Sequence, residues 1–111
     1  MLDGCYTIRL QTLLGSKPGW LVLETNDTNL HGVLTLLGMD NPFAGGHSQG
    51  DEGEFAGVIR TLFGKFSYTA RVCIEGDQLL AWLETTRGKM TMTGLRSALP
   101  SPDQNSDWRK K

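Results

Sequence analysis

The chain has 111 residues, two cysteines and a formal net charge of −1. It has the size of a single domain that buries its own core, and its balanced charge argues against nucleic-acid binding, which needs a concentrated basic surface. No run approaches the roughly 18 apolar residues that a spanning helix requires. From the charge and from this absence, respectively, we expect neither nucleic acid nor a membrane as a partner. The opening MLDGCYTIRL lacks the basic start and apolar run of a signal peptide, which predicts a cytoplasmic protein with reduced cysteines.

One four-letter phrase recurs through the chain at even intervals. TLLG occurs at 12–15 and 35–38, TLFG at 61–64 and TTRG at 85–88, with threonine spacings of 23, 26 and 24 residues. Acidic turn residues keep step with it, namely Asp3, Asp27, Asp51 and Asp77. Each unit therefore reads as an aspartate turn, a strand, a T-x-x-G turn and a second strand. This pattern predicts four hairpin repeats of about 24 residues.

The stretches between the turns alternate apolar and polar residues with a period of two, which is typical of half-buried β-strands. Tyr6, Ile8 and Leu10 share one face of the first stretch, and Thr7 and Arg9 share the other. The expected strands are 4–12, 19–26, 28–37, 41–47, 53–63, 66–75, 78–86 and 89–97. A meander with one apolar face hides that face and its two edges most simply by closing on itself. We therefore expect an all-β, eight-stranded antiparallel up-and-down barrel over residues 1–97.

Three segments depart from this rhythm. Residues 39–50, which include Pro42 and Gly45-Gly46, are either a degenerate strand or a flap over the barrel mouth. Strand 19–26 has apolar residues on both faces, so the sequence leaves open which face points inward. Residues 98–111 contain two prolines, many polar residues and a basic end, which predicts a disordered polar tail.

The sequence contains no recognisable catalytic or metal-binding constellation. His47 lies near several carboxylates, but their spacing matches no established metal motif. Cys5 and Cys73 both fall on the polar side of their strands, and no nucleophile motif or phosphate-binding loop is present. We therefore predict no enzyme activity, no metal and no cofactor.

Two sets of residues are candidates for binding. The first is an apolar or aromatic lining of the barrel lumen, made of Tyr6, Ile8, Phe55, Ile59, Phe66, Tyr68, Met90 and Met92. The second is an outer apolar surface that includes Val33, Val58 and Trp82, which predicts a homo-oligomer. An eight-stranded interior is just wide enough to be filled by side chains or to hold one small ligand, and the sequence leaves both open.

Both ends of the strand region also carry short motifs, Gly4-Cys5-Tyr6 at the start and Thr93-Gly94-Leu95-Arg96 at the finish. They resemble those of the calycins, the up-and-down barrels that include lipocalins, fatty-acid-binding proteins and avidins. That family opens with G-x-W and places an Arg or Lys in its last strand, so Tyr6 stands here where the family has Trp. The resemblance implies that Tyr6 closes one barrel end and that Arg96 packs across it.

Two functions follow as expectations. The first is non-enzymatic binding of a small hydrophobic or aromatic ligand in the lumen. The alternative is a ligand-free barrel that acts as a homo-oligomeric protein-interaction module. A lumen of at least a few hundred Å3 would favour the first function, and a filled core with a large outer patch would favour the second.

Overall fold

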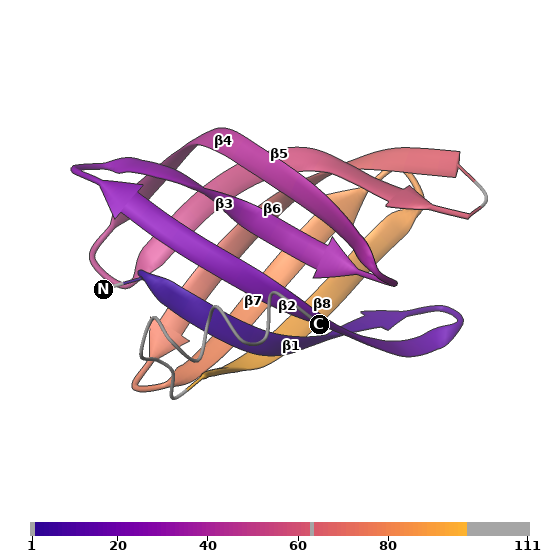
Figure 1. The fold of residues 1–111 in the computed structure, drawn as a ribbon, viewed down its shortest axis with the longest axis horizontal. Helices are drawn as coiled ribbons and strands as arrows, with labels where there is room; N and C mark the ends of the chain where they lie inside the picture. Colours follow the sequence, from indigo (N-terminus) through magenta and orange to yellow (C-terminus); the bar gives the residue numbers. More distant parts are fainter. Residues whose placement is uncertain (1, 63, 98–111) are drawn as a thin grey trace.

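The computed structural model describes residues 2–62 and 64–97, and the expected tail at 98–111 lies outside them. Each strand pairs antiparallel with the next, and β1 also pairs with β8, so the sheet closes into a barrel (Figure 1). The strands are β1 (Gly4–Thr12), β2 (Gly15–Asn26), β3 (Asn29–Leu36), β4 (Met39–Gln49), β5 (Glu52–Thr61), β6 (Gly64–Glu75), β7 (Gln78–Thr85) and β8 (Gly88–Arg96). The predicted fold class is confirmed. The described residues include no helix capable of crossing a membrane.

The barrel has two ends, which we name by what lies there. The T-x-x-G end carries the turns of the β1–β2, β3–β4, β5–β6 and β7–β8 hairpins, at the right of Figure 1. The N-terminal end carries the three remaining turns and the start of the chain.

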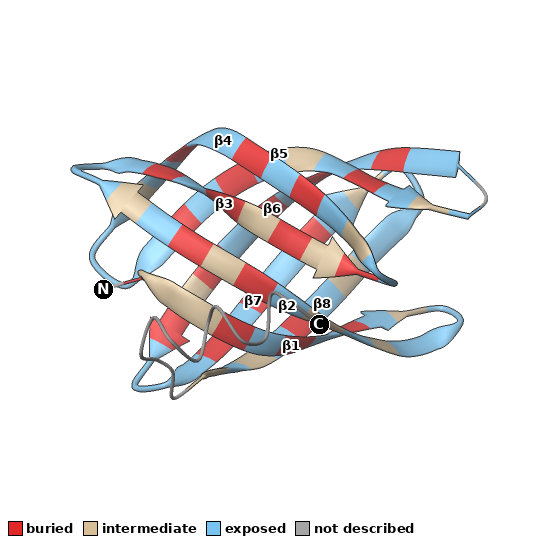
Figure 2. Cartoon of the chain, in the orientation of Figure 1, coloured by how far each residue is buried: buried red, intermediate tan, exposed pale blue. Residues whose placement is uncertain are grey.

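Alternation of side chains produces the core directly. Along β6, Phe66, Tyr68, Ala70, Val72 and Ile74 are buried, and the residues between them are exposed or half-buried. A similar banding appears on most of the strands in Figure 2. In β2, Leu21 and Leu23 point inward, which decides the face that the sequence left open. β2 also begins at Gly15 rather than 19, because it pairs with β1 along the whole of that strand.

Residues 39–49 form a strand, not a flap, although an irregular one. A bulge shifts the register between β3 and β4, and Gly45 adopts a φ of 79° there. β4 pairs with β5 only near the N-terminal end, through three residue pairs. Farther along, the buried Asn41 side chain links β4 to both neighbouring strands. It donates to the Leu34 carbonyl of β3 at 3.1 Å and accepts from the Arg60 amide of β5 at 3.1 Å. Its amide group takes the place of missing ladder hydrogen bonds.

The phrase TLLG adopts two different turns. Thr12, like Thr61 and Thr85, ends its strand at an inward register position and donates its hydroxyl to the carbonyl of the glycine three residues later, at 2.7–2.9 Å. Thr35 instead stands at an outward position and bonds Asp40 at 2.7 Å. The turn is therefore shifted by one residue, onto Leu37 and Gly38 with φ of 54° and 78°. The cause lies upstream, because Leu30, Leu34 and Leu36 must all point inward.

Candidate functional site

The predicted lumen residues do share one interior. Seven of them are buried, and Met90 packs half-buried against the cluster. The seven buried residues are Tyr6, Ile8, Phe55, Ile59, Phe66, Tyr68 and Met92. Phe55 stacks on Phe43 with a centroid distance of 4.0 Å and meets the Tyr68 ring edge-on at 6.0 Å. Phe43 was missed from the sequence, because it lies in the irregular stretch where the two-residue period is broken by the bulge.

Side chains fill this interior. Each of the 21 hydrophobic residues of the core is at most 8% exposed, and Tyr6, Leu21, Leu30 and Leu34 are completely buried. The two grooves described below lie on the outer wall. Such filling is the ordinary state of an eight-stranded barrel of this width. The residues predicted to line the lumen therefore form part of the packed hydrophobic core.

Tyr68 places an unsatisfied polar group inside the barrel. Its side chain lies across the cross-strand Gly57, with the hydroxyl 2.9 Å from where a Gly57 Cβ would stand. The Tyr68 residue is only 3% exposed, and its hydroxyl has no hydrogen-bond partner among the described residues. Burial raises the pKa of this phenol well above its ordinary value, so it stays protonated. It is an unused hydrogen-bond donor facing the core.

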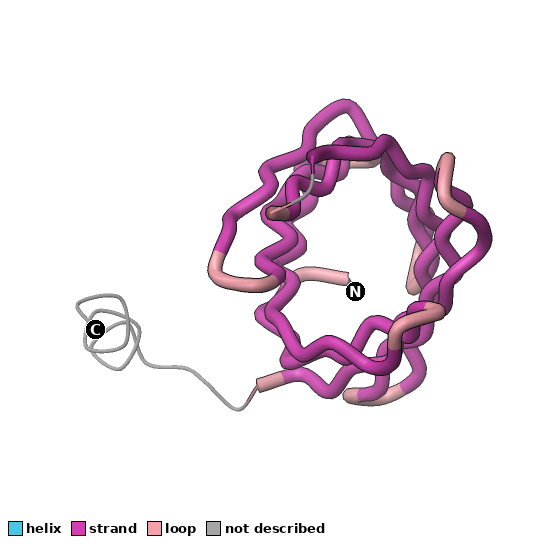
Figure 3. Tube along the Cα trace, turned by 90° about the vertical axis from the view of Figure 1, so that its right-hand side faces the viewer, coloured by secondary structure: helices cyan, strands magenta, loops and turns pink. Residues whose placement is uncertain are grey.

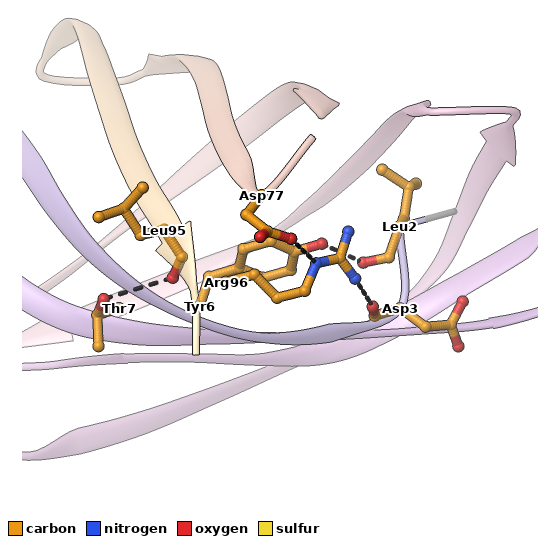
Figure 4. A network of polar contacts seen from close by, with 7 residues as sticks. All are labelled: Leu2, Asp3, Tyr6, Thr7, Asp77, Leu95 and Arg96. Atoms are coloured by element: carbon orange, nitrogen blue, oxygen red, sulfur yellow. Dashed lines mark hydrogen bonds and ion pairs between the residues drawn. The ribbon is translucent and has the colours of Figure 1, made fainter. Parts of the chain in front are cut away.

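The N-terminal end of the barrel is closed by the chain's own start, which turns into the ring of strands in Figure 3. Leu2 is completely buried, and its carbonyl accepts a 2.7 Å hydrogen bond from the Tyr6 hydroxyl. The Arg96 guanidinium lies 5.2 Å above the Tyr6 ring, donates to the Asp3 carbonyl at 2.5 Å and pairs with Asp77 at 3.3 Å (Figure 4). Tyr6 and Arg96, paired by the calycin resemblance, thus lie together at this end.

Asp3 ties the same segment to β2. Burial raises the pKa of its carboxyl, but hydrogen bonds from the Thr25 hydroxyl at 2.5 Å and the Thr25 amide at 3.1 Å outweigh that effect. The pKa of Asp3 is consequently below its usual value. This carboxylate helps to hold the N-terminal segment at neutral pH.

The opposite mouth has a similar but looser cover. Arg87, from the β7–β8 turn, places its guanidinium 4.9 Å from the centroid of the Phe66 ring. Each end of the barrel therefore has an arginine stacked on an inward-facing aromatic ring. Nothing in the spacing of Arg87 and Phe66 along the chain indicated this contact.

The predicted interface residues lie on the outer wall, on alternate strands of the barrel. Val33 is on β3, Val58 on β5 and Trp82 on β7, so another strand separates each from the next. Trp82 lines a groove of about 720 Å3 together with His47 and the exposed ion pair of Arg71 and Glu54, whose atoms are 3.0 Å apart.

The structure brings a different apolar set together. Trp20 of β2, Leu80 of β7 and Leu95 of β8 surround an outer groove of about 910 Å3. These three side chains are 39%, 41% and 57% exposed. Leu95 was missed from the sequence, because only closure of β8 onto β1 places it across Thr7 from Trp20. We call this region the β7–β2 groove; its wall runs over β7, β8, β1 and β2 and includes the end of β6.

The described residues contain no cluster of three or more histidine, cysteine or carboxylate side chains suited to a metal ion. Cys5 and Cys73 are half-buried cysteines on β1 and β6. Comparison of the chain with protein-family models, curated proteins and solved structures gives no match. The class that the structure defines is a closed, eight-stranded antiparallel barrel with a filled interior.

Proposed function

We propose that the protein is a non-enzymatic interaction module that self-associates through the β7–β2 groove. The observation that carries this proposal is the contrast between the two faces of the sheet. The interior is packed with side chains, and Trp20, Leu80 and Leu95 stand exposed around one outer hollow. Exposed apolar side chains that gather at one place are typical of interfaces.

The charges of the groove are suited to a two-fold contact. Arg9 and Glu75 both line it, so one surface offers a cation and a carboxylate beside the apolar residues. In a two-fold symmetric dimer, Arg9 of one copy can face Glu75 of the other, and the symmetry repeats the same contact with the copies exchanged. Trp20 supplies the kind of large side chain on which binding energy concentrates.

The test is the mass of the protein in solution, measured by light scattering over a range of concentrations. We expect the wild-type chain to form an oligomer. The double variant Leu80→Arg and Leu95→Arg should be a monomer, because a dimer would bury four added charges in its interface. Val58→Arg is the matched control, since Val58 is also exposed on the outer wall but does not line the groove. A wild-type monomer at every concentration, or dissociation by Val58→Arg alone, would contradict the proposal.

A second candidate function is binding of a small hydrophobic or aromatic ligand inside the barrel. The unpartnered Tyr68 hydroxyl favours it, because a buried donor without an acceptor is uncommon and a ligand oxygen would satisfy it. Such a ligand would displace side chains such as the half-buried Met90 at the T-x-x-G end. Native mass spectrometry of protein purified from cells tests this function, since a retained small-molecule mass would support it and a bare chain would count against it.

We also propose, together with this second function, that the barrel is of the calycin type. Its support is the contact of Arg96 with the Tyr6 ring across the end where the chain begins. Packing of a last-strand cation on a first-strand aromatic is what the resemblance implies.

A further inference from the structure

The hairpins of the T-x-x-G end present leucines at their tips, where turns usually carry polar residues. Leu13 and Leu14 in the β1–β2 turn are 97% and 86% exposed, and Leu62 in the β5–β6 turn is 83% exposed. Leu37 in the β3–β4 turn is 54% exposed. The β1–β2 and β5–β6 hairpins also reach farthest to the right in Figure 1. Three almost fully exposed leucines therefore project from one end of the barrel.

The same end is basic. Over the described residues, the half of the barrel toward it has six cations and two carboxylates, a formal charge of +4. The cations are Arg9, Lys17, Arg60, Lys65, Arg87 and Lys89. The half toward the N-terminal end has two cations and eight carboxylates, a formal charge of −6. The near-zero net charge of the chain thus conceals a strong separation along the barrel axis.

The cations of the two ends also differ in their partners. At the N-terminal end, Arg71 pairs with Glu54 at 3.0 Å and Arg96 with Asp77 at 3.3 Å. Within the described part of the chain, none of the six cations of the T-x-x-G half forms an ion pair. Lys65 is the second residue of β6, three positions after Leu62, and Arg87 lies in the β7–β8 turn at the same end of the barrel. No carboxylate of the described residues therefore neutralises the charges of these cations.

We propose that the T-x-x-G end docks on an anionic phospholipid surface. Leu13, Leu14 and Leu62 enter the acyl boundary, and the surrounding cations contact the phosphate and carboxylate headgroups. Short apolar tips combined with a basic surround supply the two attractions that peripheral membrane binding needs. This role lies beyond the proposed self-association, which uses the side wall, and it differs from our expectation that a membrane is not a partner.

A second copy of the chain is the other occupant with complementary charge, because its N-terminal end is acidic. That end offers little apolar surface to the leucines, since its turn residues include Asp27, Thr28, Gly50, Asp51 and Asp77. A head-to-tail contact would therefore bury the leucine tips against carboxylates, which is unfavourable. A lipid surface satisfies the tips and the cations together.

The experiment is co-sedimentation of the full chain with vesicles of phosphatidylcholine alone and of phosphatidylcholine mixed with phosphatidylserine. We expect binding to the mixed vesicles only, and weaker binding as salt is raised. The triple variant Leu13→Ser, Leu14→Ser and Leu62→Ser should weaken partitioning by about tenfold or more. Lys65→Glu and Lys89→Glu should each weaken it by at least about fivefold.

Val58→Ser is the matched control, because it removes an exposed apolar side chain from the wall rather than from a tip. It should sediment like the wild-type chain. Unchanged binding of the triple variant, equal binding to both vesicle types or no binding at all would each overturn the proposal. Light scattering without vesicles gives a further test. If the wild-type chain forms an oligomer and the triple variant does not, the leucine tips are an interface between copies and the proposal is overturned.

A direct measurement of insertion complements these variants. In Leu14→Trp, the added indole should shift its emission to shorter wavelength on mixed vesicles and be quenched by brominated acyl chains. Subtraction of the wild-type signal removes the contribution of the natural tryptophans. An emission spectrum that the mixed vesicles leave unchanged would contradict the proposal even if the protein sediments.

Discussion

Tyr6 and Tyr68 are two inward-facing tyrosines of the same barrel with opposite hydrogen-bond states. The Tyr6 hydroxyl donates to the Leu2 carbonyl at 2.7 Å, whereas the Tyr68 hydroxyl has no partner among the described residues. Replacement of either tyrosine by phenylalanine removes one oxygen and keeps the ring. The two substitutions therefore compare a satisfied buried hydroxyl with an unsatisfied one.

We expect Tyr6→Phe to lower the free energy of unfolding by about 1–2 kcal/mol, because it leaves a buried carbonyl unpaired. Tyr68→Phe should leave that free energy unchanged or raise it by up to about 1 kcal/mol, because it removes a buried group that gains nothing from the protein. Urea titration of both variants measures the difference. A loss of stability in Tyr68→Phe would mean that its hydroxyl is hydrogen-bonded in solution, and it would strengthen the case for a molecule inside the barrel.

At the scale of elements, the β3–β4 hairpin carries a residue that is poorly matched to its turn. Leu37 has a φ of 54° and is followed by Gly38 with a φ of 78°, the two positive values of a type I′ turn. Leucine is disfavoured in this left-handed conformation, whereas asparagine adopts it readily. Leu37 keeps this unfavourable backbone conformation because Leu36, one residue earlier, has to remain in the core.

Leu37→Asn should therefore raise the free energy of unfolding by about 0.5–1 kcal/mol. Leu14 is the matched control, because it is the third letter of the identical phrase but does not have a positive φ. Leu14→Asn should change stability by less than about 0.5 kcal/mol. Thermal or urea unfolding of the two variants tests the expectation, and equal effects would show that the two phrases share one turn.

At the scale of the whole molecule, closure of the barrel depends on a residue next to the chain start. Leu2 is completely buried, and one of its methyl carbons lies against Gly53, where an added Cβ would be only 2.8 Å away. It fills the end of the lumen that Tyr6 and Arg96 cover. A residue that precedes the first strand thus acts as part of the core.

Leu2→Ala should lower the free energy of unfolding by about 2–4 kcal/mol, as expected for a leucine truncated in a packed core. Leu13→Ala makes the same chemical change at a fully exposed tip and should cost less than about 0.5 kcal/mol. Chemical denaturation measures both. If the two variants unfold at the same denaturant concentration, the N-terminal segment does not plug the barrel.

Strand number and most of the inward face follow from local patterns in the sequence. The two-residue alternation of Phe66, Tyr68 and Val72 and the even spacing of turns depend only on neighbouring residues, so they can be read directly. The sequence left residues 39–50 open between a strand and a flap, and it did not reveal the inward position of Phe43, because a bulge interrupts the alternation. The identical phrases at 12–15 and 35–38 show that four letters do not determine a turn when the register of the preceding strand differs.

The sequence by itself determined an all-β meander of eight strands with one apolar face, because these properties arise from periodicity and turn chemistry. Only the tertiary structure decided that the interior is filled, that Trp20, Leu80 and Leu95 share one groove and that the leucine tips share one basic end. Each of these depends on which strands become neighbours and on where the hairpins point once β8 closes onto β1. Closure is a relation between residues about 90 positions apart, and no local pattern encodes it.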